Sequence, residues 1–323
     1  MTKNVAKQKD PGAAKKPARN AKKKTPRPGK KGGRIKAIFA AIVVLGILGC
    51  ILGAHINAGV VVVKYEEVYL RDLPAAFDGT TALFISDIHL MGTHTPESAL
   101  DMMESLETLG ADILLLGGDY ASRSISETKN GYDAKSAMET RRIEFFAGLS
   151  DFSAPMGKFG VYGNHDIDVS GLREEMQLGG IMLLQNQVAK IAIGEDALYI
   201  AGLDDYNVGH PNISAISGAV NSGDCVIMLT HTPDALPAIA SSEAADGGKW
   251  ADVVLAGHTH GGQIRIFGWS PRIPSVHGEK YLTGWVKENG HTMLVSNGAG
   301  CTAINLRWGA EAQAHLITFR RAN

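Results

Sequence analysis

The chain has 323 residues, of which 20% are charged and 45% are hydrophobic, so it is neither a disordered chain nor a multi-span membrane protein. Three cysteines without a C-x-x-C pair exclude a disulfide-framed mini-protein and a Cys-rich zinc module. The net charge of −1 hides a strong asymmetry: residues 1–36 carry fourteen Lys or Arg and one acid, whereas the rest carries 18 basic and 32 acidic residues.

Residues 1–36 are predicted to be a disordered basic tail. Lys, Pro, Gly and Ala dominate this segment, which cannot bury enough apolar surface to offset its ordering entropy. The tail could bind anionic lipid or nucleic acid. The acidic remainder of the chain disfavours a broad nucleic-acid-binding face, so no stable nucleic-acid partner is expected.

Residues 37–57 are predicted to form a transmembrane anchor. No Asp, Glu, Lys or Arg occurs from Ala37 to Val63, and a bilayer core of ~30 Å needs roughly 20 helical residues. A buried core helix is one alternative, although helices that are apolar on every side are rare in soluble domains. A cleaved signal peptide is another, although the basic front is long for one. The basic tail should stay cytoplasmic, which makes residues 58–323 an extracytoplasmic domain of a single-pass membrane protein.

After Lys64, short apolar strands alternate with helical stretches. Helices are predicted at Pro96–Leu109, at Ala134–Leu149 and near Gly171–Leu178. The predicted strands are Ala82–Ser86, Asp112–Leu116, Phe159–Tyr162, Ile191–Ile193, Leu198–Ala201, Cys225–Leu229, Val253–Ala256, Met293–Ser296 and His315–Phe319. Alternating units of this length favour an α/β sheet with helical cover.

Five of these strands are followed by carboxylate, imidazole or carboxamide side chains. The blocks are Asp87-Ile88-His89, Gly117-Gly118-Asp119, Gly163-Asn164-His165-Asp166, Thr230-His231 and Gly257-His258-Thr259-His260. Ligands of open α/β sheets gather beyond the carboxyl ends of the strands, so we expect these groups to converge. Uncompensated, so many titratable groups in one cleft would repel or lose hydration. Divalent cations such as manganese, iron or zinc resolve that conflict.

This order of blocks resembles the calcineurin-like metallophosphoesterases, whose pattern is D-x-H, G-D, G-N-H-D/E, H and G-H-x-H. All five blocks are present between Asp87 and His260. The Gly-Gly-Gln after His260 and the segment 296–300 are similar to the membrane-associated bacterial phosphodiesterase branch of the YaeI/YkuE type. The resemblance covers roughly residues 65–323 and implies a metallophosphoesterase-type α/β-β/α sandwich, with two packed mixed sheets flanked by helices.

The resemblance also implies a site with two metals, manganese being favoured and iron or zinc the alternatives. The implied ligands are Asp87, His89 and His260 at one metal, Asn164, His231 and His258 at the other, and Asp119 bridging both. His165 would be a phosphate ligand or general acid, with Asp166 orienting its ring. A hydroxide bridging the metals would attack phosphorus in line with the leaving oxygen.

The sequence therefore favours a membrane-anchored phosphoesterase that cleaves a phosphodiester or pyrophosphate in a lipid-linked or envelope substrate. One alternative is a phosphomonoesterase or protein phosphatase of the same fold. A second is a non-catalytic membrane protein with a remnant metal site, against which the complete ligand set argues. A third is a nucleic-acid enzyme, which would need the tail and the body on one side of the membrane. The oligomeric state is left open.

Overall fold

The structure, a computed structural model, describes residues 31–322 except 93, 130–133 and 168–170. Most of the predicted basic tail, residues 1–30, therefore lies outside the described residues. The chain divides into two compact units, residues 1–48 and residues 49–323.

The first described element is helix α1 (Lys31–Ala58), which begins six residues before the predicted anchor and ends one residue after it. Within the described residues, one helix is long and apolar enough to cross a membrane, over Arg34–Ala58. Only 6% of its most apolar stretch of 18 residues is buried, and Phe39 and Leu45 are exposed. A core helix of a soluble protein would be mostly buried, so this exposure disfavours the core-helix alternative.

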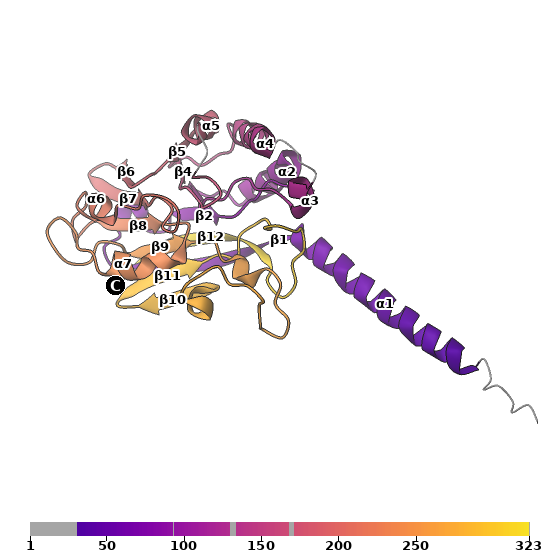
Figure 1. The fold of residues 1–323 in the computed structure, drawn as a ribbon. Coiled ribbons are helices and arrows are strands. Elements are labelled where there is room, and N and C mark those ends of the chain that lie inside the picture. The colour runs from indigo at the N-terminus through magenta and orange to yellow at the C-terminus, as the bar shows by residue number, and fades with distance from the viewer. Residues whose placement is uncertain (1–30, 93, 130–133, 168–170, 323) are drawn as a thin grey trace, which may run out of the picture. The chain divides into compact units, whose positions relative to one another are not determined.

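The larger unit is built on two six-stranded sheets (Figure 1). The first sheet has the order β1 (Val61–Leu70), β12 (Ala312–Arg321), β2 (Thr81–Ile85), β3 (Ile113–Leu116), β4 (Lys158–Gly160) and β5 (Ile181–Leu183). The second has the order β10 (Gly284–Glu288), β11 (His291–Val295), β9 (Val253–Ala256), β8 (Cys225–Leu229), β7 (Asp196–Gly202) and β6 (Gln187–Ile193). Both are mixed, because β12 runs antiparallel to β2, and β10 and β6 run antiparallel to their neighbours.

Six helices of the larger unit follow α1 in the described residues. They are α2 (Pro96–Glu107), α3 (Ile125–Lys129), α4 (Ala134–Gly148), α5 (Leu172–Leu178), α6 (Ile213–Ser217) and α7 (Leu236–Ala240). Helix α2 begins where the hydroxyl of Thr95 accepts a hydrogen bond from the Ser98 amide, with Pro96 as its first residue. Both features favour a helix start, because the cap satisfies a free N–H and proline presets the backbone angle. Helices α2, α4 and α5 confirm the three predicted helices.

The core forms three apolar layers. Alternate residues of β2 face opposite sides: Ala82 and Phe84 pack between the sheets, whereas Leu83 and Ile85 pack under α2, α4 and α5. A third cluster joins the outer face of the second sheet to α6 and α7. Because the central strands are buried on both faces, their sequences are continuous apolar runs. The result is the expected sandwich of two packed mixed sheets flanked by helices.

Candidate metal centre

The predicted polar side chains converge where strands of both sheets end. β2, β3 and β4 of the first sheet and β8 and β9 of the second all end at this place. Hydrogen bonds cross between the sheets here: among them, the His231 ring nitrogen Nδ1 lies 2.7 Å from the Gly117 carbonyl, and the His258 amide donates to the Asp87 carboxylate at 3.0 Å. The site is therefore assembled by packing the two sheets together.

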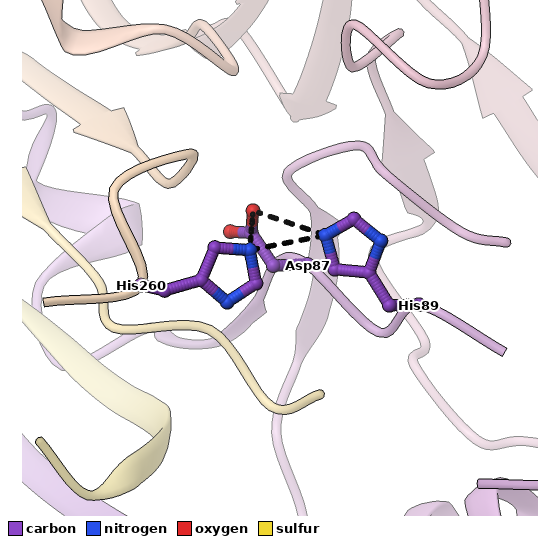
Figure 2. Close-up of side chains that lie close together, drawn as sticks. All are labelled: Asp87, His89 and His260. Atoms are coloured by element: carbon purple, nitrogen blue, oxygen red, sulfur yellow. Dashed lines mark hydrogen bonds and ion pairs between the residues drawn. The ribbon is translucent and has the colours of Figure 1, made fainter. Parts of the chain in front are cut away.

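One cluster consists of Asp87, His89 and His260. The Nε2 atoms of the two imidazoles lie 3.0 Å apart, and Asp87 Oδ1 lies 3.3 Å from His260 Nε2 and 3.9 Å from His89 Nε2. Figure 2 shows both rings turned toward the carboxylate. All three residues are buried, and their nearest donor atoms lie within 4.8 Å of one another. Two imidazoles and a carboxylate are a donor set that suits a divalent cation.

A second cluster also contacts Asp119, and its His231 Nε2 lies 3.9 Å from Asp87 Oδ1 of the first cluster. His231 Nε2 is 3.2 Å from His258 Nδ1 and 3.3 Å from Asp119 Oδ2. The same carboxylate oxygen is 3.4 Å from His89 Nε2, so Asp119 stands between the two clusters. The amide oxygen of Asn164 is buried and has no hydrogen-bond partner among the described residues. Asn164 lines the same cavity as His258, and an orphaned buried acceptor there marks a position that a cation would satisfy.

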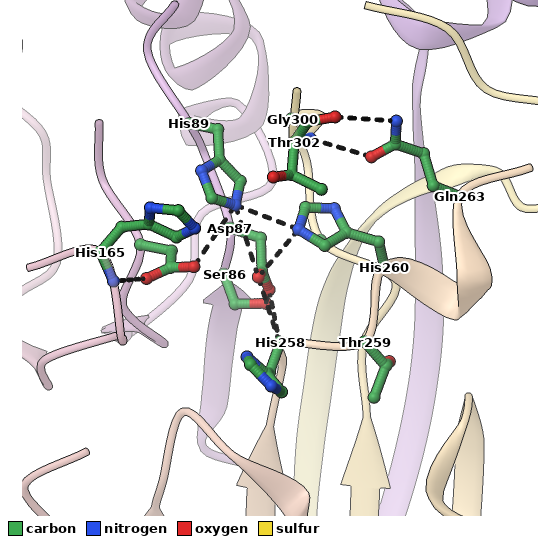
Figure 3. A network of polar contacts seen from close by, with 12 residues as sticks. Ser86, Asp87, His89, His165, His258, Thr259, His260, Gln263, Gly300 and Thr302 are labelled. Carbon is green, nitrogen blue, oxygen red and sulfur yellow. Dashed lines mark hydrogen bonds and ion pairs between the residues drawn. The ribbon is translucent and has the colours of Figure 1, made fainter. Parts of the chain in front are cut away.

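His165 lies at the exposed edge of the site. Its backbone N–H donates to Asp119 Oδ1 at 2.8 Å, and its ring stands edge-on to the His89 ring with centroids 5.2 Å apart. Figure 3 shows the His165 ring on the same side of Asp87 as His89. An exposed imidazole beside buried donors can exchange a proton with a bound substrate.

The Asp166 carboxylate binds backbone amides. It accepts hydrogen bonds from Asp119 at 2.7 Å, from Gly163 at 2.9 Å and from Tyr120 at 3.2 Å. Burial, together with the charge of Asp119, raises the pKa of Asp166 to about 7. These bonds fix the backbone on both sides of the site, and the orientation of the His165 ring by Asp166 stays a prediction.

The backbone at the site is strained. Left-handed φ angles occur at Asp87 (52°), His89 (48°), Asp119 (58°), His258 (72°) and His260 (53°). Such angles are uncommon outside glycine and cluster at functional sites. The bend lets His258 and His260, two residues apart, reach different clusters instead of opposite faces of a strand. Gly257 permits this close packing, because a Cβ there would lie 2.3 Å from Asp87 Oδ2.

The electrostatics of the site call for positive charge. Burial lowers the pKa of His89 to about 4 and that of His260 well below its usual value, which keeps both rings in the neutral form that ligates metals. Burial also opposes charge at His231, but the carboxylates of Asp119 and Asp87 outweigh it and raise its pKa well above 6.5. Without a metal, the buried carboxylates favour a proton on His231. A divalent cation would supply the positive charge in place of that proton. The residues present therefore fit metal ions.

Comparison with known proteins agrees with this geometry. Residues 80–262 match the family described as calcineurin-like phosphoesterase. The chain belongs to this family. A metallophosphoesterase of Bacillus subtilis (strain 168), YkuE, is 27% identical over 255 residues, covering 78% of this chain and 82% of the relative. Phosphodiesterase YaeI of Escherichia coli (strain K12) is 26% identical and covers 69% of this chain and 74% of the relative. A "transmembrane protein with metallophosphoesterase domain" of Danio rerio is 26% identical, and the match covers 79% of this chain and 56% of the relative.

This calcineurin-like phosphoesterase is a metal-dependent phosphoester hydrolase. The family uses dinuclear metal sites, and the structure holds three overlapping Asp/His groups that could bind metal.

Arg307 is a residue of the site that the sequence analysis missed. Its side chain is fully buried and donates hydrogen bonds to the carbonyls of Asn297 at 2.7 Å, Gly298 at 3.1 Å and Gly300 at 3.1 Å. Its Nη2 also lies 3.3 Å from His260 Nδ1. The segment 296–300 in turn packs on Asp87, since the Gly300 amide donates to the Asp87 carbonyl at 2.7 Å. Arg307 therefore holds the wall behind the first cluster.

A cavity of about 310 Å³ opens beside the clusters. Asn164 and His165 line it, together with the apolar residues Ile264 and Ile304. Gln263 joins two of its walls, because its amide group donates to the Thr302 carbonyl at 3.1 Å and accepts from the Thr302 amide at 2.8 Å (Figure 3). The lining therefore includes both candidate metal ligands and apolar side chains.

Proposed function

We propose that this metallophosphoesterase is a membrane-anchored phosphodiesterase with a two-metal centre, acting on a phosphodiester or pyrophosphate of a lipid-linked or envelope substrate. One observation carries the two-metal proposal. A single carboxylate oxygen, Asp119 Oδ2, lies 3.4 Å from His89 Nε2 in one cluster and 3.3 Å from His231 Nε2 in the other. A shared carboxylate keeps two cations close despite their repulsion.

Each cluster would hold one cation. The proposed ligands are Asp87, His89 and His260 for the first, Asn164, His231 and His258 for the second, and Asp119 for both. Mixed Asp, His and Asn donors suit manganese, iron or zinc, and we favour manganese. Bound there, two divalent cations would lower the pKa of a water molecule and polarise a phosphoryl oxygen.

The residues around the centre would bind substrate and move the proton. His165 reaches the cavity while its backbone is fixed by Asp119, so its imidazole can donate a proton to the leaving oxygen. Asp166 would keep that loop in position through its three backbone hydrogen bonds. The apolar residues Ile264 and Ile304 that line the cavity would help to exclude water from the substrate's leaving group.

Anchoring is supported by the exposed apolar helix α1. We propose that residues 37–57 cross the membrane, that residues 1–36 form a cytoplasmic basic tail, and that residues 58–323 form the extracytoplasmic catalytic domain. The Danio rerio relative is named a transmembrane protein, in agreement with this arrangement. A reporter fused after Asn323 should be active outside the cytoplasm. A cytoplasmic signal would contradict the proposed topology and favour the nucleic-acid alternative.

The reaction is tested with the full chain in detergent micelles. We expect hydrolysis of bis-p-nitrophenyl phosphate with manganese added, at a higher rate than that of p-nitrophenyl phosphate. A higher rate on the monoester would favour the phosphomonoesterase alternative. No turnover with manganese, zinc or iron would favour a remnant site. The Asp119→Asn variant, purified in parallel, controls for contaminating activity.

A further inference from the structure

A short hairpin beside the cavity exposes an apolar tip. Residues 264–269, which we name the tip hairpin, turn through Phe267 and Gly268, while Ile266 and Trp269 exchange backbone hydrogen bonds at 2.9 and 3.1 Å. Ile266 is 52% exposed and Trp269 62%, and Phe267 is fully exposed at 106%. Phe267 also holds a left-handed φ of 52°, which a bulky side chain rarely adopts. Packing within the described part of the protein therefore does not explain why three large apolar side chains stand at this position.

The tip hairpin adjoins the end of the proposed anchor. The Arg265 amide donates to the Trp308 carbonyl, and the Trp308 amide donates to the Gln263 carbonyl at 3.0 Å. The neighbouring Arg307 amide donates at 2.9 Å to the carbonyl of Ala54, in the last part of α1. His55 Nδ1 is likewise 3.0 Å from the Asn305 carbonyl. Backbone hydrogen bonds thus link the tip hairpin to the segment around Arg307, and that segment to the end of α1, where an anchored chain would leave the bilayer.

The apolar surface continues across this connection through segments that hold few acidic residues, with the exposed Glu311, paired with Lys64, at their edge. Ile304 and Trp308, in the segment that contacts α1, are 38% and 40% exposed. Residues 253–278 and 298–310 contain no Asp or Glu, although the chain after residue 36 carries 32 of them, and Arg265 and Arg272 lie beside the tip. Aromatic side chains with neighbouring arginines are the composition that partitions into the head-group region of anionic membranes.

We propose that the tip hairpin inserts into the surface of the bilayer that carries the anchor. This inference rests on the anchoring proposed above. It places the cavity at the level of the lipid head groups, because Ile264 of the hairpin and Ile304 of the adjoining segment both line it. An amphiphilic phosphoester could then pass from the bilayer into the site, with its phosphate toward the metal ligands and its apolar part along these two isoleucines.

The test uses tryptophan fluorescence of the full chain in vesicles of phosphatidylcholine and phosphatidylglycerol, with and without brominated acyl chains. Bromine quenches only tryptophans that enter the bilayer. We expect quenching in the wild type and a loss of roughly half of it in Trp269→Phe, because Trp269 is the most exposed tryptophan near the anchor. Trp285→Phe is the matched control: Trp285 is 37% exposed and lies in β10, where it bonds Glu66. That variant should quench like the wild type.

The outcomes separate this inference from the proposed function. Protein that floats with vesicles but shows equal quenching in the wild type and in Trp269→Phe overturns membrane insertion of the tip and leaves the anchor standing. Protein that fails to float overturns both. Thermal unfolding of each variant verifies that it is folded, and turnover of the soluble diester tests the catalytic proposal independently.

Discussion

Replacing Arg307 by methionine should weaken both the fold and the metal centre. The methionine keeps an unbranched apolar side chain but removes every donor and the charge. Three buried carbonyls, those of Asn297, Gly298 and Gly300, lose a partner, and His260 Nδ1 loses its neighbour. Arg307→Met therefore tests the residues that support the first cluster while every proposed metal ligand stays in place.

The magnitude follows from those contacts. Among the described residues, the carbonyls of Asn297 and Gly300 would be left without a partner, at about 1–3 kcal/mol each, whereas the Gly298 carbonyl keeps its hydrogen bond from the Gln313 amide. Relief of the buried guanidinium's desolvation offsets part of the sum, so we expect a net loss of about 3 kcal/mol in the free energy of unfolding. At about 2–4 °C per kcal/mol, Tm should fall by about 6–12 °C. The loss of a polar neighbour of a candidate metal ligand, here His260, should also weaken metal affinity by about 10- to 100-fold.

Thermal unfolding and manganese binding by equilibrium dialysis, both in the same micelles, measure these effects. Arg320→Met is the control, because Arg320 is 40% exposed and pairs with Glu67 at 3.4 Å on the surface. It should change stability by about 0.5 kcal/mol or less. An Arg307→Met protein that matches the wild type in Tm and in manganese affinity would refute the reasoning.

Three further predictions concern single side chains. Asp119→Asn should lose at least one metal, seen by elemental analysis, and most of its diesterase activity; full occupancy would exclude the bridging role. His165→Asn should keep both metals and turn over about 10²–10⁴-fold more slowly, and an empty site would instead make His165 a ligand. Burial raises the pKa of Asp252 from 3.8 to about 6, so its protonation stabilises the fold below pH 3.8 and that contribution is lost as the pH rises through 6. Asp252→Asn should therefore be more stable than the wild type above pH 7, by up to about 3 kcal/mol, and its advantage should shrink as the pH falls toward 3.8. Urea unfolding at pH 5 and pH 8 measures this, and an equal difference between variant and wild type at both pH values would show that Asp252 is solvated.

Strands with continuous apolar runs could be predicted from sequence, whereas short or alternating ones could not. β8 and β9 match their predicted ranges, because burial on both faces leaves no polar interruption. β5 has three residues and β10 alternates half-buried and exposed positions, so neither carries a distinct signal. β1 begins at Val61, inside the uncharged run that starts at Ala37. Its start could not be predicted, because composition alone does not mark where a helix ends and a strand begins.

The convergence of the site could be predicted because each polar block directly follows a strand. The partners of individual groups could not. A carboxylate next to a histidine in sequence, as Asp166 is to His165, can face the ring or the backbone, and its hydrogen bonds in the structure go to three amides. Arg307 lies in a loop without a motif, and only the fold brings it to the segment 296–300.

The two-metal centre can be observed by X-ray diffraction at the manganese absorption edge, from crystals of the full chain grown with manganese. We predict two anomalous peaks roughly 3.5–4 Å apart, on either side of the Asp119 carboxylate, one reached by His89 and His260 and the other by His231 and His258. A single peak, or two peaks that do not share Asp119, would contradict it.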